Sequence, residues 1–510
     1  MTGFGQKKSI LVDNVDTNYV NNMNSFFARF EDNDCARNVS LCISPDDDNV
    51  IFEEGEVRNE FSKLNIRKAS GPDHVSPKVL KLCSDQLSYI FTFIMNLSME
   101  SHSVPSLWKR SVILPIPKRP ITVLNDFRPI ALTSVAMKCM EKLILKRVRS
   151  CFDPIQDPFQ FAYRSKRSVE DAILLLLDNA YSHLDKPKSL CRILFLDFSS
   201  AFNTINPVIL IESLKSMNIN SHISAWIYDF LTNRTQYVNF QNVISNVITT
   251  NTGSPQGCVL SPVLFTMYTN ACSINKENVK LIKFADDSCI EGLISNYNDE
   301  LSYKESVANF TSWCDQNKLL LNTDKTKELI IDFRNKKEPV IPLTINGTEI
   351  EQVSQYKYLG VIIDNKLNWE PQASAVFKKI NKRMFFLRKL SSFNVDNTLL
   401  YLFYNSVIQS IVCFCIIAWG GNTLCKSSSK INRVIKRASR ITGHDLPHVD
   451  WLLRSLSLRK INSIENTNHP LAVFVKRSVR SNRPLLLSTK TERHKRSFLP
   501  FAISLLEFHR

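Results

Sequence analysis

Two adjacent aspartates, Asp286 and Asp287, stand in the middle of an apolar, β-prone stretch, KLIKFADDSCIEGLI, at residues 280–294. Carboxylates are costly to place among apolar residues unless a cation or another partner compensates their charge. The apolar runs on both sides predict two strands joined at Ala-Asp-Asp-Ser, so that both carboxylates lie at a hairpin tip. An ordinary polar turn explains the same residues, because Asp and Ser favour turns for hydrogen-bonding reasons of their own. The rest of the chain must decide between a metal site and a turn.

The positive charge of the chain is concentrated toward its C-terminal end. The 510 residues carry a net charge of +16, and residues 430–510 alone contain 17 Lys and Arg against 5 Asp and Glu. Such a one-sided excess favours a polyanionic partner, most often nucleic acid, over a merely solvated basic helix face. An anionic membrane surface also fits the charge. With 44% hydrophobic residues, the chain can bury a large core divided over roughly two to four domains.

The cysteines and the apolar segments predict a protein of a reducing, intracellular compartment. Thirteen cysteines occur without a repeated CxxC spacing, which predicts a reduced, intracellular protein with buried thiols. The first twenty residues lack the apolar core of a signal peptide. The most apolar run, residues 407–419, is shorter than the ~20 residues of a membrane span. We therefore expect a packed helix there and no membrane partner.

The chain divides into four regions by pattern. Residues 1–50 are polar and predict a poorly ordered lead-in, and the character of the chain changes again near residue 371, where long helices begin. Expected helices cover residues 56–64, 77–98, 134–150, 299–317, 371–390 and 397–419, with basic helices from residue 430. Expected strands lie within residues 105–120, 193–196, 280–294 and 355–364.

Three further stretches carry candidate functional residues. Lys118 and Arg128 flank a loop beside predicted β structure and suit a triphosphate, although ordinary surface charge explains them more simply. In CRILFLDFSSAF, an apolar strand runs directly into Asp197, a position where functional residues of α/β sheets collect. The loop at residues 253–257, GSPQG, opens onto an apolar helix and offers backbone N–H groups to a ligand, although a simple loop-to-helix transition has the same sequence.

Taken in order, these stretches resemble the reverse transcriptases of LINE-type (non-LTR) retrotransposons, of the jockey superfamily. The resemblance rests on WKRSVILPIPKR, NDFRPIALTS, LDFSSAF, GSPQGCVLSP, FADD, LNTDKTKE and YKYLGV, which cover residues 65 to 365. It implies an α+β, right-hand polymerase fold with fingers, a palm built on an antiparallel sheet, and a helical thumb. The implied regions are the lead-in at 1–50, fingers and palm at 51–370, thumb at 371–450, and a basic helical extension at 451–510.

The resemblance also implies residue roles. Asp197, Asp286 and Asp287 would form the catalytic carboxylate cluster that holds two Mg²⁺ ions, with Mn²⁺ as a substitute. Phe202 would exclude a 2′-hydroxyl, and Lys118, Arg128 and Gln256 would complete the nucleotide site. Gly257 would contact the template, and the hairpin residues Tyr358, Leu359 and Gly360 would grip the primer.

Two residues depart from the pattern of the family. Asn203 stands where many relatives carry Asp, and Ala271 stands where close relatives often have an acidic residue. Neither position is an implied metal ligand. The lead-in is too short for the endonuclease that usually precedes the polymerase in this family, so the sequence is expected to be a partial element.

The sequence therefore predicts an RNA-directed DNA polymerase that extends a DNA primer on an RNA template. Its partners would be the RNA template, the primer or target DNA, and dNTPs. The alternative is a catalytically silent or repurposed copy that binds RNA or DNA through its basic C-terminal region. An RNA-templated RNA polymerase is disfavoured by Phe202. The run Arg493 to Arg496, RHKR, is a weak signal for the nucleus, and the expected compartment is the nucleus or the cytoplasm.

Overall fold

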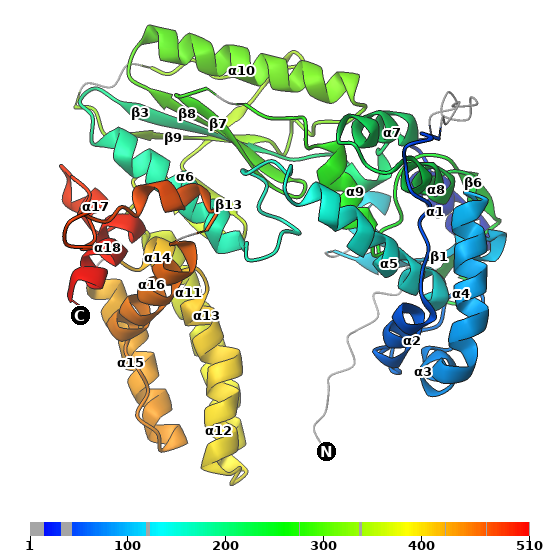
Figure 1. Ribbon diagram of the computed structural model, residues 1–510. Helices are drawn as coiled ribbons and strands as arrows, with labels where there is room; N and C mark the ends of the chain where they lie inside the picture. Colours follow the sequence, from blue (N-terminus) through cyan, green and yellow to red (C-terminus); the bar gives the residue numbers. More distant parts are fainter. Residues whose placement is uncertain are drawn as a thin grey trace. The chain divides into compact units, whose positions relative to one another are not determined.

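The chain folds into two compact units, each assembled from separated segments of sequence (Figure 1). Unit 1 comprises residues 1–157, 198–272 and 313–320, and unit 2 comprises residues 158–197, 273–312 and 321–510. The computed structural model describes residues 15–31, 43–118, 123–274, 276–335, 339–423, 425–465 and 467–508. The α+β class expected from the sequence is confirmed, because both units combine helices with a sheet.

Unit 1 contains a small mixed sheet with the order β2-β1-β4-β5, and β6 pairs with β4. β1 is antiparallel to β2 and parallel to β4. Its strands are β1 (Arg110–Pro117), β2 (Phe127–Leu132), β4 (Arg234–Phe240), β5 (Val243–Ile244) and β6 (Ile248–Thr250). Its helices are α1 (Thr17–Phe27), α2 (Glu54–Ser62), α3 (Pro77–Leu82), α4 (Ser84–Glu100), α5 (Val135–Phe152), α7 (Pro207–Ser216), α8 (Ser221–Leu231) and α9 (Ser261–Tyr268).

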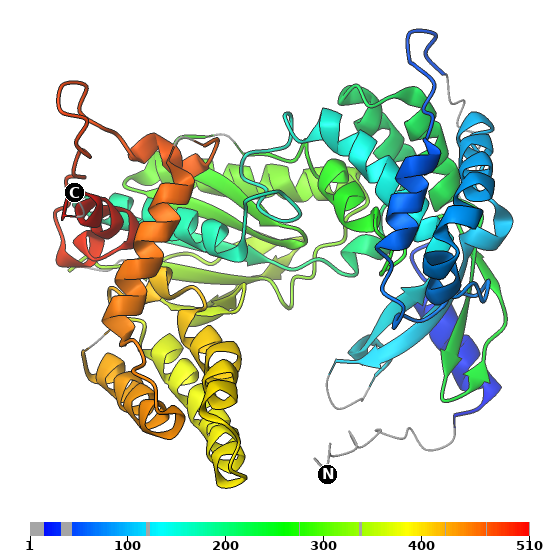
Figure 2. The ribbon, with the colours of Figure 1, turned by 60° about the horizontal axis from the view of Figure 1, so that its bottom comes forward.

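Helix α1 lies within the region expected to be a poorly ordered lead-in, of which residues 1–14 and 32–42 are outside the described residues. Asp16 caps the helix by accepting a hydrogen bond from the Tyr19 N–H at 2.7 Å. The side chains of Val20, Met23 and Phe27 are buried in one cluster with residues of β1, β2 and β4. Figure 2 shows this helix, in dark blue, against the strands of unit 1. The N-terminal helix is therefore part of the core of unit 1.

Unit 2 is built on a five-stranded sheet with the order β12-β9-β3-β8-β7. Its strands are β3 (Leu190–Leu196), β7 (Val279–Phe284), β8 (Asp287–Ile294), β9 (Lys327–Asp332) and β12 (Glu351–Val353). All pairings are antiparallel except that of β12 with β9. Every residue of the central strand β3 is buried, because α6 (Val169–Leu184) and α10 (Tyr297–Gln316) cover opposite faces of the sheet (Figure 1).

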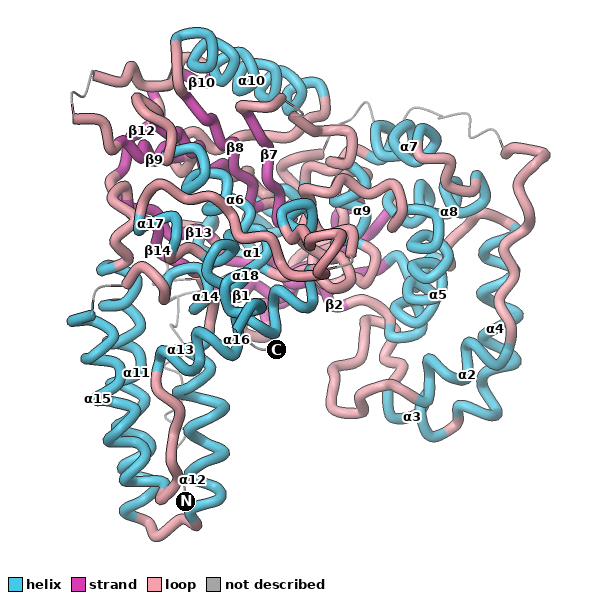
Figure 3. The backbone as a smooth tube through the Cα atoms, turned by 60° about the vertical axis from the view of Figure 1, so that its left-hand side comes forward, coloured by secondary structure: helices cyan, strands magenta, loops and turns pink. Residues whose placement is uncertain are grey.

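Long helices follow the sheet in unit 2. Figure 3 shows α11 beside both α15 and α12. The helices after the sheet are α11 (Glu370–Ser392), α12 (Asn397–Phe403), α13 (Ser410–Cys413), α14 (Ile416–Trp419), α15 (Cys425–Thr442), α16 (Val449–Ile464), α17 (Glu492–Lys495) and α18 (Phe498–Phe508). The small hairpins are β10 (Thr344–Ile345) with β11 (Thr348–Glu349), and β13 (Gln355–Tyr358) with β14 (Val361–Asp364).

The apolar stretch 397–419 was expected to form one packed helix, and it is interrupted. A π-helical turn over residues 404–409 joins α12 to α13, and Cys415 adopts a left-handed φ of 50° before α14. The stretch is long and apolar enough to cross a membrane by length and composition alone. Within unit 2, Leu400, Tyr404, Ile408 and Val412 are buried at four-residue spacing, as on the inner face of a packed helix.

The C-terminal helices share one core with the sheet of unit 2. Leu499 and Ile503 of α18 belong to the same buried cluster as Ile193 of β3. Polar contacts reinforce this packing, because the buried Asp171 of α6 accepts from His469 Nε2 at 2.8 Å and from Lys460 Nζ at 2.5 Å. The predicted region boundaries at residues 50, 370 and 450 stay predictions.

Candidate functional site

The strand register in unit 2 places Asp197 beside Asp287. β3 pairs antiparallel with β8, and the last pair of the register joins Leu196 to Ser288. Asp197 follows Leu196 and Asp287 precedes Ser288, so the two aspartates occupy adjacent positions at the same end of neighbouring strands. The carboxylate at the end of a buried strand and the carboxylate pair of the hairpin, predicted from separate parts of the sequence, are therefore neighbours.

The hairpin of β7 and β8 is tighter than the sequence suggested. Phe284 pairs with Asp287, so Ala285 and Asp286 alone form the turn. Ala285 adopts a left-handed φ of 57°, as tight two-residue hairpin turns require. Asp286 therefore lies at the tip and Asp287 is the first residue of β8, whereas the sequence placed both carboxylates at the bend.

The charges of the three aspartates act on one another. The pKa of Asp287 is raised to about 6, first by burial and then by the negative charges of Asp286 and Asp197. The Oδ2 atom of Asp197 is buried and, among the described residues, receives no hydrogen bond. Lys325 Nζ lies 3.4 Å from this oxygen and supplies the nearby positive charge. The site thus gathers like charges, and Lys325 compensates part of the charge of Asp197.

These residues fit a hard divalent cation such as Mg²⁺. Such cations take oxygen ligands, and the three side chains offer six carboxylate oxygens at one end of the sheet. A cation would remove the repulsion that raises the pKa of Asp287 and would satisfy the Oδ2 atom of Asp197. Over the described part of the chain, no three Asp, Glu, His or Cys side chains already converge closely enough to hold a metal. Binding would therefore require these side chains to turn toward a common point.

Two residues beside the aspartates were missed by the sequence analysis. The side chain of Gln160 is buried, and its Oε1 accepts the Ala285 N–H of the turn at 3.1 Å. Its backbone neighbours Phe159 and Phe161 exchange hydrogen bonds with Lys283, so this segment runs along β7. The pKa of Tyr163 is raised by burial and by the charges of Asp286 and Asp287. The only sequence signal was a polar residue between aromatic ones, in DPFQFAY.

A second hairpin of unit 2 carries the predicted primer-gripping residues. β13 pairs with β14 through Tyr358 and Val361, which leaves Leu359 and Gly360 as the turn. Both turn residues have positive φ, 46° and 92°, as expected for a type I′ turn. The ring of Tyr358 is buried, with its centroid 5.1 Å from that of Phe195 on β3. This hairpin is thus packed on the strand that leads to Asp197.

In unit 1, the predicted triphosphate cations lie on one hairpin. Arg128 of β2 is opposite Ile116 of β1, and Lys118 follows two residues later. Side chains two residues apart along a strand point to the same side, so Lys118 and Arg128 share a face. Both are exposed. Lys118 Nζ donates to the carbonyl of Asn125 at 3.2 Å, which holds the lysine near the hairpin end.

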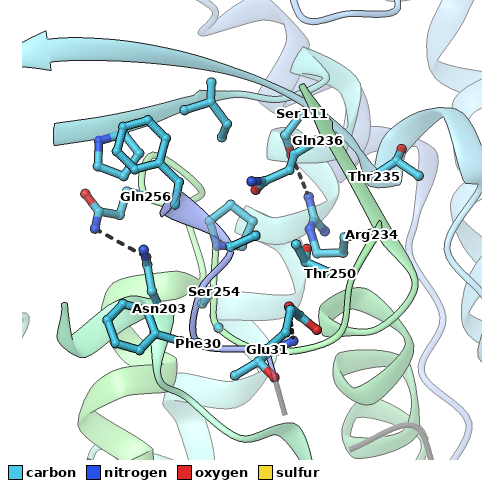
Figure 4. Close-up of a pocket in the computed structure, with 17 residues that line it drawn as sticks. Phe30, Glu31, Ser111, Asn203, Arg234, Thr235, Gln236, Thr250, Ser254 and Gln256 are labelled. Carbon is cyan, nitrogen blue, oxygen red and sulfur yellow. Dashed lines mark hydrogen bonds between the residues drawn. The ribbon is translucent and has the colours of Figure 1, made fainter. Parts of the chain in front are cut away.

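The remaining predicted residues of unit 1 meet around the 253–257 loop, of which Figure 4 labels Ser254 and Gln256. The Ser254 N–H donates to the carbonyl of Phe202 at 2.8 Å, and Gln256 Nε2 lies 3.5 Å from Asn203 Oδ1. The ring of Phe202 is 5.3 Å from that of Phe265, which fixes its position. Gly257 has a φ of 124°, and a Cβ there would meet the carbonyl oxygen of Ala131 at 2.8 Å. Only glycine fits this close approach to β2.

The structure thus gathers the predicted residues into two groups. Unit 2 holds the three aspartates together with the 358–360 turn, and unit 1 holds Lys118 and Arg128 on one hairpin and Phe202, Gln256 and Gly257 around one loop. The roles given to these residues stay predictions.

A comparison with protein-family models matches residues 116–363 to the reverse transcriptase (RNA-dependent DNA polymerase) family. This span contains every predicted site residue. A second, shorter match covers residues 369–410 and corresponds to the N-terminal region of alkylated DNA repair protein alkB homolog 8. The reverse transcriptase match supports the right-hand polymerase assignment made from the sequence.

The chain is similar to curated RNA-directed DNA polymerases of mobile elements. The RNA-directed DNA polymerase from mobile element jockey of Drosophila melanogaster is 26% identical over 62% of this chain and 35% of its own length. The probable RNA-directed DNA polymerase from transposon X-element, of the same species, is 25% identical over 80% of this chain and 45% of its own length. The chain therefore spans less than half the length of these relatives. Telomerase from Candida tropicalis, solved with a fragment of telomeric RNA, covers 78% of this chain and 68% of its own at 14% identity and a TM-score of 0.37.

Proposed function

We propose that this chain is a reverse transcriptase of the LINE-type (non-LTR) retrotransposons and that it extends a DNA primer on an RNA template by nucleotidyl transfer. The single observation that carries the proposal is the register that places Asp197 beside Asp287, with Asp286 in the adjoining turn. Phosphoryl transfer depends on positioning and on neutralising the charge of the transferred group, and a cluster of carboxylates is suited to holding the cations that do so.

We propose two Mg²⁺ ions as the resident cofactor, with Mn²⁺ as a substitute. When bound, such ions activate the primer 3′-hydroxyl and neutralise the triphosphate and the departing pyrophosphate. Asp197 and Asp286 would hold them, and Asp287 would complete the cluster. Lys325 would release Asp197 as the metal takes over the compensation of its charge.

The substrate contacts would come from the residues gathered in unit 1 and from the second hairpin of unit 2. Lys118 and Arg128 present a point charge and a bidentate fork on one hairpin face, the chemistry that recognises a triphosphate. Phe202, fixed against Phe265, would exclude the 2′-hydroxyl of a ribonucleotide. Gln256 and Gly257 would contact the nascent pair and the RNA template, and Tyr358, Leu359 and Gly360 the DNA primer.

Primer extension tests this proposal directly. Purified wild-type protein is given an RNA template, a DNA primer, dNTPs and Mg²⁺ at several salt concentrations, in parallel with the Asp286→Asn variant. We expect extension by the wild type and a loss of at least about a thousandfold in Asp286→Asn, because a catalytic carboxylate that holds a metal is removed.

Two controls sharpen the result. Chelation with EDTA should stop extension, and adding Mg²⁺ or Mn²⁺ back should restore it. Binding of the template and primer is measured separately, since Asp286→Asn should retain it. A wild-type protein that binds the template and primer but extends no primer at any salt concentration would overturn the polymerase proposal in favour of a silent, nucleic-acid-binding copy.

A further inference from the structure

The loop that carries Gln256 and Gly257 is held at its start by a carboxylate from the N-terminal segment. Glu31 Oε2 accepts the Asn251 N–H at 2.9 Å, and its Oε1 accepts the N–H groups of Asn251 and Thr252 at 3.0 and 3.2 Å. Hydrogen bonds from backbone N–H groups to a carboxylate are charge-assisted and stronger than neutral ones. Figure 4 shows Glu31 on the same pocket as Gln256 and Asn203.

A second carboxylate holds the other end of the same segment. Glu141 of α5 is fully buried, and its Oε2 accepts the N–H groups of Val259 and Leu260 at 2.6 and 2.9 Å. These residues lead into α9, so Glu141 fixes the point where the loop becomes a helix. The eight residues from Asn251 to Cys258 are therefore held at both ends by side chains from distant parts of the sequence, at the start by Glu31 and just after the end by Glu141.

The 251–258 segment contacts the parts of unit 1 that carry residues predicted to bind the substrate. The Gly253 N–H donates to the Ile205 carbonyl and the Ser254 N–H to the Phe202 carbonyl, both at 2.8 Å. The Gln256 carbonyl accepts from the Ala131 N–H of β2 at 2.8 Å. A shift at the start of the loop would therefore reach both the Phe202 turn and the strand that carries Arg128.

Glu31 is itself fixed, because the helix before it is docked by polar contacts. The buried Asn24 of α1 donates to Ser245 Oγ at 3.1 Å and to the Asn246 carbonyl at 2.9 Å, and it accepts from Gln236 of β4 at 2.9 Å. Asn21 accepts the Asn246 N–H at 2.7 Å. These contacts set the position of α1 along β4 and thereby place Glu31 at the loop.

We propose that Glu31 is a positioning residue of the polymerase, which acts through the 251–258 loop to set the nucleotide contacts of Gln256 and Phe202. The N-terminal segment is then a working part of the nucleotide site. This inference rests on the proposed function, and it assigns a role to a region for which the sequence suggested none.

The test compares Glu31→Ala with Glu31→Gln and with Asp16→Ala in primer extension. Glu31→Ala should raise the KM for dNTPs by roughly 10- to 100-fold, with a smaller fall in kcat and weaker discrimination against ribonucleotides. Glu31→Gln keeps an acceptor oxygen and should recover part of the loss. Asp16→Ala removes the cap of the same helix without touching the loop, so it should lower thermal stability and leave the KM for dNTPs unchanged.

A measurement that needs no activity keeps the inference separable from the proposed function. Hydrogen exchange of a peptide covering residues 251–258 should be faster in Glu31→Ala than in wild type, and unchanged in Asp16→Ala at a temperature where that variant is folded. Unchanged exchange in Glu31→Ala overturns the inference, and so does faster exchange with an unchanged KM. If the wild type extends no primer, the proposed function fails, and the exchange measurement alone then decides whether Glu31 holds the loop.

Discussion

The ring of Tyr356 stacks on the ring of Phe195, with centroids 4.2 Å apart and planes inclined by 10°. Phe195 lies on β3 two residues before Asp197, and Tyr356 lies on β13 two residues before Tyr358. Together with the contact between Tyr358 and Phe195, this stack joins the hairpin proposed to grip the primer to the strand that carries a proposed metal ligand. A substitution that removes the stack should therefore affect both the 358–360 turn and the position of Asp197.

Replacing Tyr356 by Ala should weaken primer binding and destabilise unit 2. The loss of a half-buried stacked ring should cost about 1–3 kcal/mol of unfolding free energy. The KM for primer and template should rise more than the KM for dNTPs, because the 358–360 turn moves first. Denaturant unfolding and steady-state extension measure the two effects. Tyr356→Phe retains the stack and should behave like wild type in both, and equal defects in the two variants would contradict this explanation.

Replacing Gln160 by Leu should shift the turn that carries Asp286 and thereby lower the rate of extension. The Ala285 N–H would lose its buried acceptor, at a cost of about 1–3 kcal/mol, and the turn would shift. We expect roughly a 10- to 100-fold lower kcat, measured by single-turnover extension with unchanged template binding. Gln160→Glu keeps an acceptor oxygen and should retain the turn. Wild-type turnover in Gln160→Leu would show that the turn holds its shape without this contact.

Replacing Phe202 by Ala should relax the preference for deoxynucleotides. Phe202 is fixed against Phe265, so its removal opens space where a 2′-hydroxyl would lie. The ratio of kcat/KM for dNTP over the matching ribonucleotide should fall by at least about tenfold, while template binding is unchanged. Phe265→Leu, which removes only the supporting ring, should give a smaller change in the same direction. An unaltered ratio in Phe202→Ala would remove the role proposed for this ring.

A buried acid in unit 2 should make stability fall as pH rises. The pKa of Glu291 is raised to about 8, chiefly by burial; the Asn179 hydrogen bond and Lys280 lower it, and the charge of Asp178 raises it. The carboxyl of an unfolded Glu has a pKa near ~4.3, so the folded state binds this proton more tightly. Its contribution to stability is full below about pH 4 and is lost as pH rises through about 8.

Glu291→Gln should therefore flatten this pH dependence and stabilise the protein at alkaline pH. The amide oxygen can still accept from Asn179 Nδ2, which lies 2.9 Å from Glu291 Oε2. Some slope should remain, because burial also raises the pKa of Asp178, to about 7. Urea unfolding between pH 5 and 9 measures the effect, with Glu349→Gln, at an exposed position, as the control. If the unfolding free energies of wild type and Glu291→Gln change with pH in parallel, the prediction is wrong.

The basic C-terminal region should bind nucleic acid through charge. Lys436 and Arg440 are exposed on α15, whereas Ile431, Val434 and Ile435 of the same helix are buried in the core of unit 2. Deletion after residue 430 would therefore remove core residues together with the charges. Replacing Lys436 and Arg440 by Gln should lower the slope of log affinity against log salt by up to about 0.9 per lost phosphate contact. The matched control replaces the exposed Lys186 and Lys188 by Gln.

Much of the site could be predicted because its signals are local. An apolar run that ends in Asp197 predicts a strand end, and the apolar runs around Asp286 predict a hairpin; both are found. The long amphipathic helices were also predicted, with ends close to those of α5, α10 and α11. The resemblance to a known family grouped Asp197 with Asp286 and Asp287, but the pairing of β3 with β8 was not predicted, because no spacing within either stretch reveals it.

The features that were not predicted depend on contacts between distant residues. Gln160 meets Ala285 across 125 positions of sequence, and Glu31 meets Asn251 across 220. Helix α1 was missed although Val20, Met23 and Phe27 have helical spacing, because its face also buries the polar Asn24. The interruption of the 397–419 helix at Cys415 was not predicted because no Gly or Pro lies within this stretch.

Because unit 2 is assembled from segments that extend much further along the chain, its core is completed later during synthesis than that of unit 1. Unit 1 has all its residues once position 320 has been synthesised, whereas the cluster around Ile193 and Ile331 is completed only by Leu499 and Ile503. At about 5–20 residues per second, the ribosome needs roughly 10–35 s to cover that interval. During this interval the buried cluster of unit 2 lacks the side chains of α18, so the core of unit 2 is completed after that of unit 1.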